Sequence, residues 1–263
     1  MTTQVGAPVS SAWKGLTTPL SGFRFLARNQ QLWRYAILPA IFNLVMTAVA
    51  VAIVLGSAWY WWSRWMPWFV EDQQDAALWV WTAVTIAVGL FVVLVAFVIA
   101  VVVWRLALVI VCGSLYGQLA EQTERILGMD EGDMHVILWS EGVVDDLHDL
   151  AAWIGHQTFS LAVAFVPLIG PIVAFCLSAH STFLQLGLDY LQYPLTLRGQ
   201  RREQRWSFAR RYRTPTLALG VSVFVIEWIP IVSSILLPSA VVGGVLLHRQ
   251  LIDVRTNSDK HEC

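Results

Sequence analysis

Two arginines, Arg28 and Arg34, precede a long run without charged residues that begins at Tyr35. If this run is a helix, its first turn offers free backbone N–H groups and the positive end of the helix dipole, and both favour an anion. Guanidinium groups add charge-assisted hydrogen bonds to such an anion. We therefore predict an anion-binding site at Arg28 and Arg34. The alternative is that both arginines anchor the helix among phospholipid headgroups.

A glutamate stands inside an apolar segment in the sequence VIEWIPIV, residues 225–232, and Pro230 follows it by three residues. At the centre of a full membrane span, Glu227 would cost several kcal/mol and need a partner. At the tip of a hairpin that only partly enters the bilayer, it can meet water or polar protein groups. We predict that Glu227 is a hairpin-tip residue. A position on a conduction path is the alternative.

Basic residues gather between positions 198 and 213, beside apolar segments. A cluster of this kind binds nucleic acid in some soluble proteins, but next to membrane segments it favours anionic lipid. We predict a lipid contact through Arg201, Arg202 and Arg205. Two histidines, His156 and His180, fall in apolar segments, and we expect hydrogen-bonded structural roles for them, with a polar path as the alternative.

No catalytic or metal-binding set is evident in the sequence. Ser114 in CGSLYG lacks the strand–turn–helix context of a nucleophile elbow. The segment DEGDMH, residues 130–135, lacks the spaced oxygen ligands of a calcium loop. The three cysteines show no metal-ligand spacing. We expect no enzyme activity, no cofactor and no metal.

The elements that carry these residues are membrane helices. Hydrophobic residues make up 57% of the 263 residues and charged residues 13%, which indicates an integral membrane protein. The runs near 35–62 and 76–112 exceed the ~20 residues that a transmembrane helix needs. Basic residues before the first run place the N-terminus in the cytoplasm by the positive-inside rule.

Two further apolar regions, near 150–193 and 215–247, are interrupted by proline. The pieces 154–166 and 216–228 are about 13 residues each, or roughly 20 Å of helix, shorter than a 30 Å hydrocarbon core. We therefore expect two re-entrant helical hairpins and an all-α fold. We expect the acidic section 113–150 to form cytoplasmic helices.

The ends of the chain differ from the apolar regions in composition. We expect a flexible tail over 1–19 and a polar tail over 251–263, so that residues 20–250 form a single membrane domain.

Five segments give the chain a resemblance to a known family. It resembles the CysZ-type sulfate permeases, which share the domain named after etoposide-induced protein 2.4. The matching segments are GFRFLARNQQLWRYAILPAIFN (22–43), SLYGQLAEQTERILG (114–128), FVPLIGPIVAF (165–175), LGLDYLQYPL (186–195) and WIPIVSSILLPSAVVGGVLL (228–247).

The resemblance implies two long transmembrane helices, two partly inserted hairpins and a homo-oligomer. It also implies an inner-membrane permease or channel for sulfate or a related oxyanion, supporting sulfur assimilation. Family members carry an arginine pair before the first long helix; here Arg34 matches one position and Trp33 occupies the other. A non-transporting scaffold or membrane-shaping protein of the same fold, bound to anionic lipid, is the alternative function.

Overall fold

The computed structural model describes residues 7–70, 83, 84, 86, 87, 89, 91, 112–135 and 139–261. Within these residues the chain is helical and has no β-strand, as expected for an all-α protein. The chain divides into two compact units, one made of Met1–Ile41 with Cys112–Cys263 and the other of Phe42–Val111. The prediction of a second transmembrane helix at 76–112 falls almost entirely outside the described residues.

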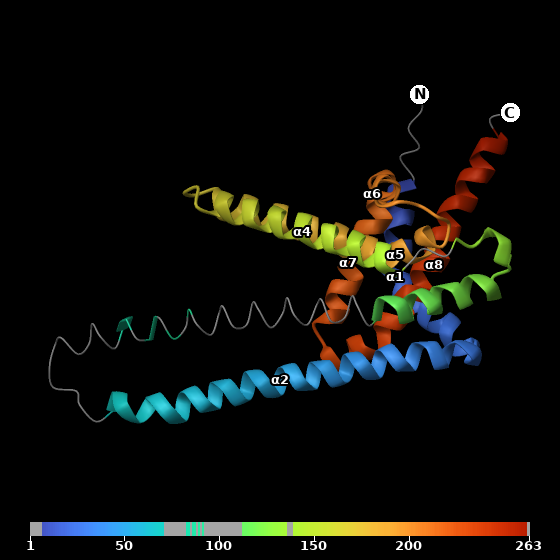
Figure 1. Cartoon of the computed structure of the whole chain (residues 1–263). Coiled ribbons are helices and arrows are strands. Elements are labelled where there is room, and N and C mark those ends of the chain that lie inside the picture. Colours follow the sequence, from blue (N-terminus) through green and yellow to red (C-terminus); the bar gives the residue numbers. More distant parts are fainter. Residues whose placement is uncertain are drawn as a thin grey trace. The chain divides into compact units, whose positions relative to one another are not determined.

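Long helices follow one another along the chain, with short turns between several of them (Figure 1). A further helix covers residues 112–126. The others are α1 (Ala7–Arg28), η1 (Gln30–Leu32), α2 (Trp33–Val70), η2 (Glu131–Asp133), α4 (Trp139–Ala164), α5 (Gly170–Thr196), α6 (Arg202–Arg211), α7 (Arg213–Glu227) and α8 (Pro230–His261).

Glycines allow the helices of the first unit to touch backbone to backbone. A Cβ on Gly22 of α1 would lie 1.9 Å from the carbonyl oxygen of Ser239 in α8. A Cβ on Gly220 of α7 would lie 1.8 Å from the carbonyl oxygen of Phe183 in α5. Membrane helices use small residues at such crossings because van der Waals contact drives their association. The core of this unit is therefore built from α1, α5, α7 and α8.

The helices end beside the prolines at which the sequence predicted breaks. The chain turns between α4 and α5 at residues 165–169, where Leu168 adopts a left-handed φ of 70°. It turns again between α7 and α8. Pro230 is the first residue of α8, a position at which the missing backbone N–H of proline costs no helical hydrogen bond. α4 and α5 run side by side from their shared turn, so the first pair has the form of a hairpin (Figure 1).

The helix lengths differ from the sequence-based expectation. α4 has 26 residues and begins at Trp139, so it is longer than the 13-residue apolar piece expected at 154–166, whereas α5, with 27 residues, ends close to the expected end of the hairpin near residue 193. α8 has 32 residues and continues through Pro238 into the polar C-terminal segment. The N-terminal segment also differs: α1 begins at Ala7, inside the range expected to be a flexible tail. Gly15 in α1 packs against Pro215.

Three helical stretches among the described residues are long and apolar enough to cross a membrane. They are Gln30–Ser57, Gly170–Thr196 and Val232–Asp253. The first confirms a membrane-length helix in the region predicted at 35–62. The other two lie in the regions expected to form partly inserted hairpins.

Candidate functional site

The two predicted anion-binding arginines occupy opposite kinds of helix end. Arg34 lies in the first turn of α2, as expected, and its side chain is exposed. Arg28 is the last residue of α1, where the negative end of the helix dipole stabilises the guanidinium itself and not a bound anion. The short helix η1 separates them. The expectation that both arginines flank one helix N-terminus is therefore correct only for Arg34.

A hollow of about 560 Å³ lies along α1, and it brings Arg28 together with Arg24. Thr17 and Ser21 line the same hollow and Leu246 of α8 borders it, whereas Arg34 does not line it. The spacing of four residues puts both guanidinium groups on one face of the helix. Sequence reasoning missed Arg24 because it treated that part of the chain as preceding the first helix.

Arg34 is held by its neighbour. Its guanidinium carbon lies 4.8 Å from the centroid of the Tyr35 ring, and its Nη2 donates a hydrogen bond of 3.0 Å to the Tyr35 hydroxyl. The preceding residue, Trp33, donates from its Nε1 to the carbonyl of Leu26 over 3.0 Å. This bond ties the start of α2 to the end of α1, so Trp33 has a structural role where family members carry an arginine.

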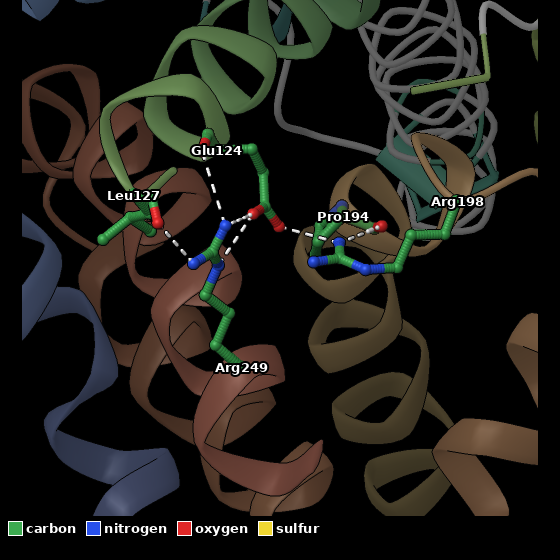
Figure 2. A network of polar contacts seen from close by, with 5 residues as sticks. All are labelled: Glu124, Leu127, Pro194, Arg198 and Arg249. Carbon is green, nitrogen blue, oxygen red and sulfur yellow. Dashed lines mark hydrogen bonds and ion pairs between the residues drawn. The ribbon is translucent and has the colours of Figure 1, made fainter. Parts of the chain in front are cut away.

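The most buried ionic group of the described chain is one that sequence reasoning did not single out. Glu124 has no exposed side-chain surface, and two arginines meet its carboxylate (Figure 2). Arg249 donates from Nε and Nη2 to Oε2 at 2.8 and 2.6 Å, and Arg198 donates from Nη1 to Oε1 at 2.7 Å. The same guanidinium groups reach the backbone carbonyls of Leu127 and Pro194.

This network joins three segments that are distant in sequence. Glu124 belongs to the helix over 112–126, Arg198 follows α5, and Arg249 lies in α8. Because both carboxylate oxygens already accept charge-assisted hydrogen bonds, the network fixes the packing of these segments and does not present a free anion receptor. The sequence gives no local signal for it, since the partners are 74 and 125 residues apart.

The predicted lipid contact needs correction at Arg205. Only 5% of this residue is exposed, and its Nη2 lies 2.5 Å from Asp145 Oδ2 in α4. Its Nη1 donates to the side chains of Gln192 and Thr196 at 3.2 and 3.3 Å. A burial this deep leaves Arg205 unavailable to a lipid surface. It holds α6 against α4 and α5 instead.

The other two arginines of the predicted contact differ from each other. Arg202 donates from Nε to Asp149 Oδ1 at 2.6 Å and keeps 34% of its side chain exposed. The indole of Trp206 donates to the same oxygen at 2.9 Å. Arg201 is exposed at the start of α6, where its backbone N–H donates to the side chain of Gln204. Arg201 and Arg202 therefore remain accessible, and Arg205 does not.

Carboxylates gather where α4 faces α5. Burial and the neighbouring Asp189 raise the pKa of Asp146 from 3.8 to about 7, and Asp149 adds to the effect. Arg205 and a hydrogen bond from Gln192 act in the opposite direction. Asp146 therefore binds a proton close to neutral pH, outside the stretches long enough to span a membrane.

The remaining predicted residues lie at a turn and on the hairpin. Glu227 is the last residue of α7, exposed next to the turn into α8. His180 in α5 accepts a hydrogen bond of 3.1 Å from Nε of Arg213, the kind of partner expected for a structural histidine. His156 of α4 lines a groove together with His180.

The apolar helices, the buried ion pairs between them and the exposed arginines beside the first long helix define a class, the all-helical membrane proteins. Residues 18–238 match the family described as "Sulfate transporter CysZ/Etoposide-induced protein 2.4". This match covers most of the chain, and the protein belongs to this family. No curated protein matches the chain.

Proposed function

We propose that the protein is a permease or channel of the cytoplasmic membrane that passes sulfate or a related oxyanion. The observation that carries the proposal is the family match over residues 18–238, since the family is described as a sulfate transporter. The structure supplies compatible chemistry in the exposed guanidinium group of Arg34, in the first turn of a membrane-length helix, and in that of Arg28, at the end of α1. Arg24 adds a second cation beside Arg28.

The topology that supports this function keeps the N-terminus in the cytoplasm and lets the α4–α5 and α7–α8 pairs enter the bilayer partway. Within Gln30–Ser57 only 11% of the most apolar window is buried by the rest of the chain. A surface this apolar needs lipid or another copy of the protein to cover it. We propose a homo-oligomer, because one chain provides few walls for a conduction path.

A sulfate-binding measurement on the purified protein tests the site. We expect radiolabelled sulfate to bind the wild type in detergent and to bind Arg28→Gln and Arg34→Gln about tenfold more weakly, because each variant removes a charge-assisted hydrogen bond. The matched control is Arg211→Gln, which removes an exposed arginine from the end of α6. Equal weakening in all three variants would assign the effect to net charge and reject the site.

The structural role of Trp33 favours a second function, a non-transporting scaffold or membrane-shaping protein of the same fold. One family arginine is absent here, and its replacement joins α1 to α2 through the bond to Leu26. This alternative requires that no sulfate crosses a sealed bilayer containing the protein. Saturable flux would reject it.

A further inference from the structure

A groove of about 670 Å³ lies where α4, α5 and α6 meet, and it is separate from the hollow beside Arg28. Its walls combine cations, imidazoles and indoles, whereas the hollow beside Arg28 has no imidazole in its lining. Its lining includes Trp153 and His156 of α4, His180 of α5, and Arg202, Trp206 and Arg210 of α6.

The groove offers guanidinium donors to an anion from Arg202 and Arg210, whereas the single N–H of the Trp206 indole already donates to Asp149. Arg202, Trp206 and Arg210 recur at intervals of four residues on one face of α6. Asp149 holds both Arg202 Nε and the Trp206 indole and so fixes the α6 side of the groove. Arg210 is exposed.

His180 adds a neutral donor. Because its Nε2 accepts from Arg213, the ring proton resides on Nδ1 in the neutral form and Nδ1 can donate. Glu203 is the one acidic residue in the lining of this groove, and its side chain is exposed.

The position of the groove along the hairpin matches the depth of one lipid leaflet. At 1.5 Å per residue, His180 lies about 15 Å from Gly170, the first residue of α5. Trp153 lies about 16 Å from Ala164, the last residue of α4. Half of a 30 Å hydrocarbon core is also about 15 Å. A hairpin whose turn reaches the bilayer centre therefore places this groove among the headgroups.

The surface between the groove and the turn is apolar and exposed, as lipid chains require. Phe159 is 61% exposed, Phe165 83%, Leu168 94% and Phe175 74%. In Figure 1 the turn between α4 and α5 forms the free end of the hairpin, away from α6. The groove, with its cations and indoles, and the apolar surface towards the turn thus match the headgroup region and the acyl chains of a phospholipid.

We propose that the groove between α4, α5 and α6 binds the phosphate of an anionic phospholipid, whose acyl chains lie along the exposed face of the α4–α5 hairpin. Arg202 and Arg210 bind the phosphate, and Trp153 and Trp206 cover the glycerol region. The site requires that the hairpin lies in a bilayer, and it does not require that the protein conducts an anion.

The test measures retention of radiolabelled phosphatidylglycerol by full-length protein immobilised in detergent micelles. The variant is Arg210→Gln, and its control is Arg211→Gln, the next residue on the same helix, which is also exposed but does not line the groove. We expect the dissociation constant to rise about tenfold for Arg210→Gln and less than twofold for Arg211→Gln, since only the first removes a phosphate hydrogen bond.

Each other outcome overturns the proposal. Equal changes of the dissociation constant in both variants would indicate attraction by net charge alone. An unchanged dissociation constant in both would show that the phosphate does not bind in the groove. Equal retention of phosphatidylcholine would exclude a preference for anionic lipid. Weaker binding of radiolabelled sulfate by Arg210→Gln, with unchanged retention of phosphatidylglycerol, would identify the ligand as a free oxyanion.

Discussion

Glu124 shows how one buried charge can hold three segments together. Its carboxylate is fully buried and accepts hydrogen bonds from Arg198 and Arg249. Removing one partner of a buried ion pair is costly because the remaining charges stay in a poorly solvated place. The residue therefore stabilises the packing of the helix over 112–126 against α8 and the end of α5.

The variant Glu124→Gln should lower the free energy of unfolding by about 3 kcal/mol, since it leaves two half-buried guanidinium groups without a counter-charge. Thermal unfolding in detergent, followed by intrinsic fluorescence, measures the change. Arg125→Gln is the control at the next position, where an exposed arginine pairs with Glu121 and Glu131. It should unfold close to the wild type, because exposed ion pairs contribute little. A wild-type melting temperature for Glu124→Gln would contradict the role of the network.

Asp146 makes the stability of the fold depend on pH. Its pKa of about 7 in the folded protein, against 3.8 in the unfolded chain, means that the folded form holds the proton more tightly. The resulting stabilisation is complete below about pH 4 and is lost as the pH rises through about 7. The wild type should therefore lose stability between about pH 4 and pH 7.

The variant Asp146→Asn removes this titration and should flatten that dependence and be the more stable protein at pH 8. The difference in melting temperature between variant and wild type, measured at several pH values, isolates this group from other titrating residues. A difference that stays constant with pH would show that Asp146 titrates in its ordinary range.

At the scale of single residues, the sequence shows where charged residues meet apolar segments but not what surrounds them. It placed Arg34 at a helix start and Glu227 beside a turn, because a charged residue next to an apolar run can be recognised in the sequence itself. It could not separate the exposed Arg201 from the buried Arg205, since the partner of Arg205 is Asp145, 60 residues earlier in the chain. Glu124 was unremarkable within an acidic section for the same reason.

At the scale of helices, the α1–α8 crossing depends on glycine. A Cβ on Gly22 would fall 1.9 Å from the carbonyl oxygen of Ser239 and 2.5 Å from the amide nitrogen of Gly243. Both obstacles are backbone atoms, which cannot rotate away as a side chain could. The two helices must separate to admit even a methyl group.

The variant Gly22→Ala should lower the unfolding free energy by about 1–3 kcal/mol, the usual cost of overpacking. Gly155→Ala, inside α4 with open space around its Cα, is the control and should be neutral or slightly stabilising because alanine favours the helix. Melting temperatures of the two variants in one detergent give the comparison. Similar values would mean that the crossing is looser than this close contact implies.

Helix breaks could be predicted from sequence, and helix lengths could not. Proline marked both turns, because it lacks the backbone N–H that a helix interior uses, although α8 continues through Pro238. α4 begins far upstream of its apolar piece because Asp145 and Asp149 are satisfied by arginines of α6, a contact that no hydropathy pattern contains. The first part of α1 was expected to belong to a flexible tail, because the packing of this helix depends on glycines, which carry no hydrophobic signal.

At the scale of the molecule, the long helices differ in how much of their surface the chain itself covers. The most apolar window of Val232–Asp253 is 67% buried, whereas that of Gln30–Ser57 is 11% buried. The first is a core helix of its unit. The second needs lipid or a second copy against it, which is the physical reason for proposing an oligomer.

The proposed oligomer makes a prediction about mass. Light scattering of the protein in detergent, corrected for bound detergent, should give a multiple of the 29.5 kDa chain. A single chain mass at every protein concentration and in several mild detergents would exclude a stable homo-oligomer.

The central proposal, passage of an oxyanion, is tested most directly by flux of radiolabelled sulfate into sealed proteoliposomes containing the wild-type protein. We expect uptake that saturates with sulfate concentration, exceeds that of protein-free vesicles, and falls several-fold with Arg34→Gln but not with Arg211→Gln. Uptake equal to that of protein-free vesicles, from correctly folded protein, would contradict the permease and leave the scaffold as the function.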